Sequence, residues 1–339
     1  MQKNVLISLA ILSTLTAGYF FLKNKTSETE NLSTKPVTLK DLYQQWKVEH
    51  KQTFSTTEDE YRFKVFALNY AQINEHNVHP NKTWEMGVNA FSHLTDEEFE
   101  AIYAGEDLDD SDEMTLLDED IIEFPATNIR TSVDWSSKMN PVRSQTGCGA
   151  CWAFSAVATI ESLYAVKTGT RLELSEQQLV DCSGSHGNKG CKGGKKDKAL
   201  AFVAANGGLA ARAAYPYRAA QGACRNNLPK YGRISRFQAI APGNPEALKA
   251  ALNYQPVAVS VNAQGWKSYR SGIINDVKCP QSTTHAIIVV GYNMSHSPPF
   301  YIVRNSWGQG WGEKGYARVA ITGGLGICGI QKTPFVAVL

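Results

Sequence analysis

A short glycine-rich run, QTGCGACWAFS at residues 145–155, constrains this 339-residue chain more than any other segment. It predicts a loop that ends at the first turn of a helix, with Cys151 at the helix N-terminus. Unsatisfied backbone N–H groups and the positive end of the helix dipole lie there, and both favour a thiolate. Gln145 precedes it on the loop, where its amide could donate to a developing oxyanion. Cys151 is therefore a candidate nucleophile, with an inert buried thiol as the alternative.

A nucleophilic cysteine needs a base, and the C-terminal half offers one. His285 opens an apolar, strand-like run, and Asn305 stands in the segment RNSWG at residues 304–308. Cysteine, histidine and asparagine in that order form the sequence pattern of a thiol acyl-transfer triad. Taken alone, each residue has an ordinary alternative: a structural histidine, a turn asparagine, and a solvated loop glutamine at Gln145.

Four segments together resemble papain-like cysteine proteases of the cathepsin L type, in their precursor form, over roughly residues 40–339. They are the run at 145–155, the segment 181–194, THAIIVVGY at 284–292, and NSWGQGWGEKGY at 305–316. The resemblance implies that Cys151 is the nucleophile, His285 the base, Asn305 its orienting partner and Gln145 the oxyanion donor. It implies hydrolysis of proteins and peptides through an acyl-enzyme, without a metal or organic cofactor.

The resemblance implies an α+β, two-lobed papain-like fold, with a helical N-terminal lobe and a β-barrel-like C-terminal lobe, preceded by a helical propeptide. Periodicity agrees with that order. Helices are predicted over residues 151–167, 175–180 and 198–205, and strands over 256–261, 285–292, 300–305 and 316–321. We expect the substrate to bind in the cleft between the lobes.

The N-terminal third divides into two predicted segments. Residues 1–22 are typical of a secretory signal cleaved after Gly18, with an uncleaved membrane anchor as the alternative. Residues 23–127 are predicted to be an inhibitory propeptide with helices over 39–51 and 57–79, the second capped by Thr57. The second helix matches the family's propeptide helix at Glu58, Arg62, Phe66, Asn69, Ile73 and Asn77.

Two further features mark the propeptide. Its next motif carries His93, where relatives usually have aspartate. Residues 105–123 hold ten carboxylates, and this charge density favours an extended segment in which a processing cut is tolerated. The resemblance places the start of the mature peptidase near residues 128–130, so the predicted peptidase domain is 128–339.

Net charge divides the chain at the same boundary. Residues 1–127 carry 10 Lys and Arg against 23 Asp and Glu, whereas residues 128–339 carry 24 against 9. No nucleic-acid motif accompanies the basic portion, so we expect its partner to be the chain's own acidic propeptide rather than nucleic acid. We expect the protein to be a monomer. We also expect the precursor to be latent near neutral pH, where the acidic propeptide attracts the basic peptidase, and to activate in acid, which protonates the carboxylates and weakens that attraction.

All seven cysteines lie in the basic portion, and an odd number in an oxidising compartment leaves one outside the disulfides. Six cysteines allow 15 pairings, among which spacing does not choose. The resemblance implies Cys148–Cys191, Cys182–Cys224 and Cys279–Cys328, which leaves Cys151 as the thiol. A zinc site built on Cys182, Cys191 and His186 is the weaker alternative.

The resemblance also assigns residues to substrate binding: Gly193, Gly194, Lys196, Ser260, Ala286, Trp307 and Thr333. Glycine permits close approach of an extended peptide, and a flexible turn is the alternative. Relatives carry apolar residues where Lys196 stands, in the pocket for the second residue before the cut. We expect Lys196 to turn its amine outward and line the pocket with its stem. An inward amine would instead favour an acidic substrate side chain.

Destination and rival functions complete the expectations. The signal and the cysteines predict the secretory pathway, leading to a lysosome, an acidic vacuole or secretion. Glycosylation sequons occur at Asn24, Asn31, Asn81 and Asn293. The rivals are a catalytically dead homologue, a thiol transferase or ligase on the same triad, and an exopeptidase. Only eight residues separate Cys182 from Cys191, which leaves no room for the cleft-blocking insertion of carboxydipeptidase relatives.

Overall fold

The computed structural model describes residues 37–103, 120–125, 127 and 129–339. The predicted signal segment and most of the acidic run at 105–123 lie outside these residues. Residues 1–42 form a unit separate from residues 43–339, and the fold described below is that of the larger unit. Across the described residues, no helix is long and apolar enough to cross a membrane.

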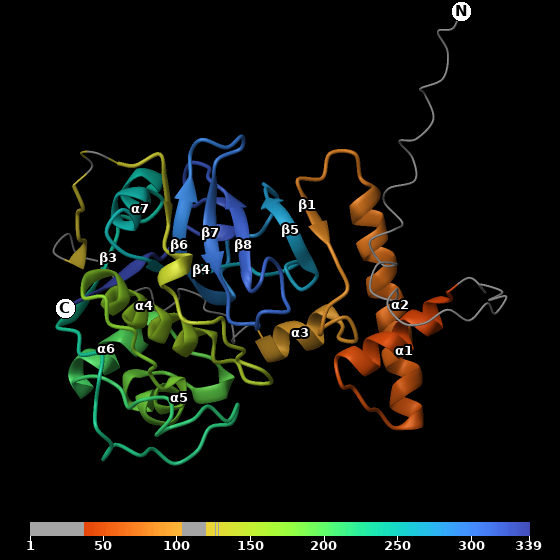
Figure 1. Cartoon of the computed structure of the whole chain (residues 1–339), viewed down its shortest axis with the longest axis horizontal. Coiled ribbons are helices and arrows are strands. Elements are labelled where there is room, and N and C mark those ends of the chain that lie inside the picture. The colour runs from red at the N-terminus through yellow and green to blue at the C-terminus, as the bar shows by residue number, and fades with distance from the viewer. Residues whose placement is uncertain (1–36, 104–119, 126, 128) are drawn as a thin grey trace, which may run out of the picture. The chain divides into compact units, whose positions relative to one another are not determined.

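The N-terminal part of the larger unit is mainly helical (Figure 1). Its elements are the part of α1 (Leu39–Glu49) that follows Leu42, then α2 (Thr56–Val78), β1 (Trp84–Met86) and α3 (Asp96–Tyr103). The inward face of α2 buries Val65, Phe66, Asn69 and Ile73, a spacing of three to four residues that gives one helical stripe. The Trp46 ring packs on Phe66 at 5.6 Å between ring centroids. The helix begins one residue before Thr57, with Ser55 at the cap position, so the predicted Thr57 cap is wrong.

A helical lobe follows (Figure 1). Its helices are α4 (Cys151–Lys167), α5 (Glu176–Cys182) and α6 (Lys196–Asn206). Local capping sets two of the boundaries: Ser175 accepts a hydrogen bond from the Gln178 N–H, and Gly207 ends α6 in the left-handed conformation. Because α4 is buried on nearly all sides, it forms the centre of the lobe's core.

The second lobe is a mixed sheet. Its strands are β2 (Ser132–Asp134), β3 (Arg236–Ala239), β4 (Val257–Val261), β5 (Tyr269–Ile274), β6 (His285–Asn293), β7 (Phe300–Arg304), β8 (Tyr316–Ala320) and β9 (Phe335–Val338). The strand order is β1-β5-β8-β7-β6-β4-β9-β3, with β2 also paired to β6. Only β5 and β8 pair in parallel among these strands. Helix α7 (Pro245–Leu252) packs on β6 and β4.

Two hydrophobic cores correspond to the two lobes. One is built around α4 and also takes in Ala286 and Phe335, and the other is built on the strands around Val289 and Val303. The Ser155 hydroxyl donates to the Ile287 carbonyl at 2.8 Å and ties α4 to β6. The predicted α+β, two-lobed architecture is therefore confirmed, with the barrel-like lobe present as this mixed sheet. The predicted strands agree with β4, β6, β7 and β8 to within a residue.

The N-terminal part joins the sheet directly. Strand β1 pairs antiparallel with β5, and Trp84 lies opposite Gly272. A Cβ on Gly272 would lie 2.5 Å from the Trp84 Cα, and its φ of +98° also favours glycine. The residues before the peptidase thus cover an edge strand that would otherwise expose unpaired backbone groups.

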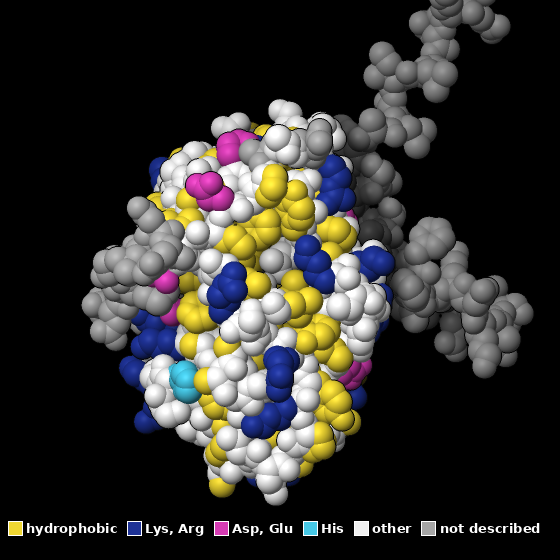
Figure 2. Space-filling view, turned by 90° about the vertical axis from the view of Figure 1, so that its left-hand side faces the viewer, with side chains coloured by type: hydrophobic (Ala, Val, Ile, Leu, Met, Phe, Trp, Pro, Cys, Tyr) yellow, Lys and Arg dark blue, Asp and Glu magenta, His cyan; other side chains and the backbone are white. Residues whose placement is uncertain are grey.

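The visible surface of the peptidase carries dispersed positive charge. Figure 2 shows lysine and arginine side chains spread over one face among apolar and uncharged groups, with few acidic ones. This agrees with the excess of 24 Lys and Arg over 9 Asp and Glu after residue 127.

Candidate active site

Cys151 is the first residue of α4 and is fully buried. The loop before it is fixed by the Cys148–Cys191 disulfide and by a hydrogen bond from the Gly149 N–H to the Cys191 carbonyl at 3.0 Å. A Cβ on Gly149 would lie 2.7 Å from that same oxygen, so the close approach requires glycine. The N–H of Cys151 belongs to the first turn of the helix, where the backbone donors and the helix dipole favour negative charge at the sulfur.

His285 and Asn305 meet across neighbouring strands. His285 is the first residue of β6, Asn305 follows β7, and Nε2 of the imidazole lies 2.8 Å from Oδ1 of Asn305. Oδ1 also accepts from the Ser306 N–H, so Nε2 is the donor in the neutral ring. Nδ1 is then the acceptor nitrogen, and within the described residues it makes no hydrogen bond of normal geometry.

The imidazole is deeply buried. The ring of Trp307 stacks on it with 4.7 Å between centroids. Burial lowers the pKa of His285 to about 4, while the hydrogen bond to Asn305 and the main chain of Tyr103 oppose that shift. In this covered state the neutral imidazole is therefore favoured over the imidazolium.

Gln145 is fully buried, so the alternative of a solvated loop glutamine is wrong. Its Nε2 donates to the carbonyl of Tyr103 at 3.1 Å and to that of Cys148 at 3.0 Å. Its Oε1 accepts from the Ser306 hydroxyl at 2.7 Å, which fixes the direction of the amide. A peptide carbonyl from the N-terminal part thus occupies the position at which an amide donor is aimed.

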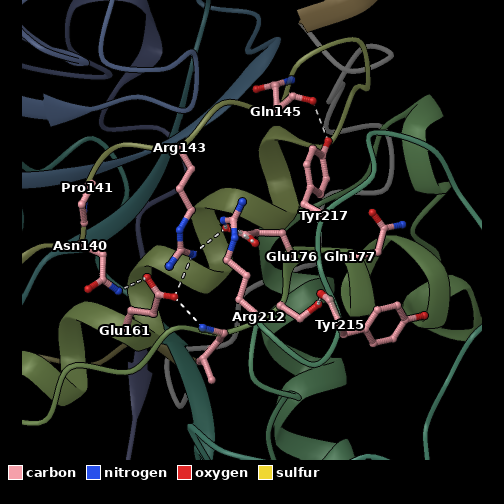
Figure 3. Close-up of polar contacts among 12 residues, drawn as sticks. Asn140, Pro141, Arg143, Gln145, Glu161, Glu176, Gln177, Arg212, Tyr215 and Tyr217 are labelled. Carbon is pink, nitrogen blue, oxygen red and sulfur yellow. Dashed lines mark hydrogen bonds and ion pairs between the residues drawn. The ribbon is translucent and has the colours of Figure 1, made fainter.

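Tyr217 supports the glutamine from the helical lobe. Its hydroxyl donates to the Gln145 main-chain carbonyl at 2.7 Å, as the dashed line in Figure 3 shows. Burial raises the pKa of Tyr217, so this hydroxyl keeps its proton. The sequence analysis missed both Tyr217 and Ser306. Ser306 is part of the NSWG motif and could have been predicted from it, whereas Tyr217 lies in no recognisable motif.

Aromatic rings of the N-terminal part cover Trp307. Phe99 lies edge-on to it with 4.9 Å between centroids, and Phe91 and Tyr103 lie at 6.1 and 6.5 Å. Trp307 therefore shields the histidine on one side and receives helix α3 on the other. Trp307 is also part of the hydrophobic core of the strand lobe.

Lys267 anchors the N-terminal part at a second point. Its buried amine lies 2.9 Å from Oδ1 of Asn69, 2.9 Å from the Leu94 carbonyl and 2.7 Å from Oδ1 of Asp96. Its own carbonyl accepts from Asn89 at 2.7 Å. Lysine is seldom buried without such acceptors, and here they come from helix α2 (Asn69) and from the start of α3 (Leu94 and Asp96).

The structure contains the disulfides Cys148–Cys191, Cys182–Cys224 and Cys279–Cys328, the pairs that the resemblance implies. Cys151 remains the thiol. The alternative zinc set therefore loses both of its sulfur ligands, since Cys182 and Cys191 are each bonded to another sulfur. Among the described residues no group of three or more histidine, cysteine or carboxylate side chains could hold a metal ion.

The predicted pocket residues come together from both lobes. Lys196 Nζ lies 2.8 Å from Ser260 Oγ and 3.0 Å from Thr333 Oγ1. Ser260 pairs with Ala286 across β4 and β6. The amine therefore points inward, and the expectation that it turns outward is wrong.

The neighbouring glycines have a packing role of their own. A Cβ on Gly194 would lie 2.8 Å from the Trp152 ring and 2.5 Å from Asn188 Oδ1. Gly193 has a φ of +112°, which suits glycine. Gly194 therefore packs closely against Trp152 of α4.

Comparison with known proteins identifies the family. Residues 129–338 match the papain family cysteine proteases, and residues 43–99 match the cathepsin propeptide inhibitor domain (I29). The chain belongs to the papain family of cysteine proteases. It is a thiol protease made as a precursor with an inhibitory propeptide, and its similarity to cathepsin L-type precursors is confirmed.

Relatives of the family agree over nearly the whole chain. Ananain from Ananas comosus is 36% identical over 303 residues, with 86% of each chain covered. Caricain from Carica papaya is 38% identical over 306 residues, covering 87% of this chain and 85% of caricain.

Solved precursors of the family have the same fold. A recombinant stem bromelain precursor superposes with a TM-score of 0.79 at 34% identity, covering 89% of this chain and 99% of the other. Digestive procathepsin L 3 of Tenebrio molitor gives 0.80 at 32% identity, with the same coverage.

Proposed function

We propose that this protease is an endopeptidase that cuts peptide bonds through a Cys151–His285–Asn305 triad and an acyl-enzyme. The observation that carries the proposal is the hydrogen bond from the Gln145 amide to the carbonyl of Tyr103 at 3.1 Å, with the His285–Asn305 pair beside the same residue. The Tyr103 carbonyl accepts from the Gln145 amide, the same group that would donate to an oxyanion.

In the proposed reaction, the Cys151 thiol gives its proton to Nδ1 of His285, and the sulfur attacks the substrate carbonyl carbon. The Gln145 amide and the Cys151 N–H hold the resulting oxyanion. The C–N bond breaks as the imidazolium gives its proton to the leaving amine. Water, deprotonated by His285, then attacks the acyl-enzyme and releases the carboxylic acid and the thiol.

The proposed route to activity is removal of the propeptide. We assign residues 1–22 to a signal peptide, 23–127 to the propeptide and 128–339 to the mature peptidase. Departure of Tyr103 would vacate the Gln145 amide and admit water to His285, which raises the pKa of a desolvated imidazole toward its usual value. The imidazolium required by the thiolate pair then becomes accessible.

The proposed setting is the secretory pathway and an acidic compartment or secretion, because three disulfides persist only where conditions are oxidising. The enzyme would act as a monomer on proteins and peptides, without nucleic acid.

Replacing the nucleophile tests the proposal. In the mature domain, prepared for both proteins with an added protease that is then removed, Cys151→Ser should lower hydrolysis of an unfolded protein roughly a million-fold, as loss of a triad nucleophile does elsewhere. The fold and the three disulfides should be unchanged by circular dichroism and thiol titration. An epoxysuccinyl thiol inhibitor should block the native enzyme only. Residual inhibitor-sensitive hydrolysis in purified Cys151→Ser would overturn the assignment.

A further inference from the structure

Thr146, which directly follows the proposed oxyanion donor Gln145, has a backbone conformation that a residue with a side chain rarely adopts. Its φ is +46°, in the left-handed region where the Cβ crowds the backbone. The residue is exposed, so burial of its own side chain does not hold it there. A strained residue keeps its conformation only where the surrounding structure fixes it. The contacts of the neighbouring peptide groups must therefore hold this turn.

The peptide group between Gln145 and Thr146 is held from both of its polar ends. The Tyr217 hydroxyl donates to the Gln145 carbonyl at 2.7 Å, and the Thr146 N–H donates to Ser144 Oγ at 3.2 Å. The Tyr217 ring packs edge-on to Phe154 of α4, with 4.9 Å between centroids, so the hydroxyl has a fixed position. Figure 3 shows the tyrosine directed at the main chain of the glutamine. Tyr217 therefore helps to set the orientation of this peptide group.

The same turn sets the direction of the Gln145 side-chain amide. The Thr146 carbonyl accepts from the Cys148 N–H at 2.9 Å, and the Cys148 carbonyl accepts from Nε2 of Gln145 at 3.0 Å. A rotation of the peptide group after Gln145 would shift Thr146 and then Cys148. It would thereby move an acceptor that directs the amide.

We propose that Tyr217 is a positioning residue for the hydrolysis, because its hydroxyl holds the strained turn at Thr146 in the form that directs the Gln145 amide at the oxyanion. The inference rests on the proposed function. The amide acts on charge that develops in the transition state, so a loss of its alignment lowers kcat and leaves KM nearly unchanged. The competing explanation is that Tyr217 only packs the helical lobe, and in that case its effect does not depend on Gln145.

The first test is Tyr217→Phe, which removes the hydroxyl and keeps the ring against Phe154. Each full-length precursor is matured with the same added protease, which is then removed, and kcat and KM are measured on one peptide substrate. The variant should lower kcat about tenfold, the size expected for one buried carbonyl that loses its donor. This is less than the roughly 10²–10³-fold loss expected when a whole oxyanion donor is removed.

The matched control is Tyr164→Phe. Tyr164 lies on α4 in the same lobe, and its hydroxyl also donates to a main-chain carbonyl, that of Arg233, at 2.7 Å. It has no contact with the turn at Thr146 among these hydrogen bonds, so kcat should equal that of the native enzyme.

Two double variants separate positioning from packing. In a Gln145→Ala background no amide remains to be directed, so Tyr217→Phe should lower kcat by about twofold or less. Glycine adopts a positive φ without strain, so adding Thr146→Gly to Tyr217→Phe should raise kcat severalfold toward the native value. No rise in kcat would overturn the role of the strained turn.

An unchanged kcat in Tyr217→Phe overturns the inference, as does an equal loss in the native and Gln145→Ala backgrounds. Failure of the proposed function gives different results. A native kcat in Gln145→Ala would remove the proposed oxyanion donor, and hydrolysis that survives Cys151→Ser would remove the proposed nucleophile.

Discussion

Two buried ionic sites in this protein differ in where their partners lie along the chain. In the helical lobe, Arg143 contacts Glu161 at 2.9 Å and Glu176 at 2.7 Å, and Arg212 contacts Glu176 at 3.1 Å (Figure 3). All four residues belong to the peptidase. Lys267 is equally buried, but its partners belong to the propeptide.

The difference teaches what a buried charge does in each place. The ion pairs of the helical lobe do not involve the propeptide. They attach the loop that contains Gln145 to helices α4 and α5. The Lys267 site loses every one of its propeptide partners when the propeptide leaves. If the propeptide leaves, the Lys267 ammonium must be solvated by water again. The site therefore binds the chain's own propeptide more strongly than a segment that lacks Asn69 and Asp96.

Breaking the permanent cluster should have the largest effect. Arg143→Met leaves two neighbouring carboxylates buried, Glu161 at 5% and Glu176 at 1% exposed. In the Cys151→Ser precursor, which cannot digest itself under the proposed function, we expect the free energy of unfolding to fall by about 3–5 kcal/mol. Chemical denaturation measures it. Arg171→Met, an exposed arginine that donates to the Ser137 carbonyl, should cost about 0.5 kcal/mol or less.

An equal loss of unfolding free energy in both variants would mean that the Arg143 cluster contributes no more to stability than a surface arginine does. A loss confined to Arg143→Met would support the first half of the comparison.

Breaking the Lys267 site should weaken the binding of the propeptide and leave the fold of the peptidase unchanged. Lys267→Met leaves Asn69 and the Leu94 carbonyl without their cation, and truncation of a buried charge at an interface weakens association by about 2–5 kcal/mol. Labelling of Cys151 by a thiol-directed inhibitor in the precursor at neutral pH should therefore be faster by roughly 30-fold or more. Once activated, Lys267→Met should hydrolyse substrates as the native enzyme does.

The matched control is Lys249→Met. Lys249 is also buried, at 6% exposure, but its partner Glu246 lies on the same helix, α7, within the peptidase. Labelling should not accelerate in this variant. If Lys249→Met opens the precursor as much as Lys267→Met does, the lysine at the propeptide has no separate role.

Local sequence patterns predicted part of the fold. Helices α1, α2, α4, α5 and α6 and four of the strands follow from local periodicity and capping, and the proposed catalytic residues follow from short motifs. Helix α7 was missed although Asn244 caps it and Pro245 opens it, a local signal that was present. Helix α3 and strands β1, β2, β3, β5 and β9 were missed as well, and all of these strands except β5 have only three or four residues.

The role of Lys267 had no such signal, because 198 residues separate it from Asn69 and a single lysine is ordinarily a surface residue. The direction of Lys196 was mispredicted for a related reason. Its inward course depends on hydroxyls at Ser260 and Thr333, which approach it only in the folded protein. Long-range partners of polar side chains are set by the tertiary fold, and local patterns do not contain them.

A smaller effect concerns His93, which lies within the propeptide rather than at its contact with the peptidase. Its ring packs on Trp46 at 5.1 Å and on Phe54 at 5.6 Å, and its carbonyl accepts from Arg62 at 3.2 Å. Burial, with the nearby Arg62 charge, lowers the pKa of His93 to about 4, against about 6.5 in an unfolded chain. Glu98 acts in the opposite direction, and His50 adds to the lowering.

The sign of the pH effect follows from these values. The packed propeptide binds fewer protons at His93 than the unpacked one, so the stability contributed by the neutral ring is complete above about pH 6.5 and is lost as pH falls toward 4. Carboxylates act in the same direction: hydrogen bonds from Arg62 and Thr95 outweigh burial and lower the pKa of Glu98, and that contribution also disappears in acid. We therefore expect acid to loosen the propeptide through two kinds of group.

His93→Asn removes only the histidine contribution. Its activation midpoint, followed by labelling of Cys151 between about pH 7 and pH 4, should shift to lower pH by a fraction of a unit, because the carboxylates still titrate. His79→Asn, at an exposed histidine after α2, should not shift the midpoint. A midpoint in His93→Asn equal to that of the native precursor would exclude the histidine. The pH response of the propeptide would then depend on carboxylates such as Glu98.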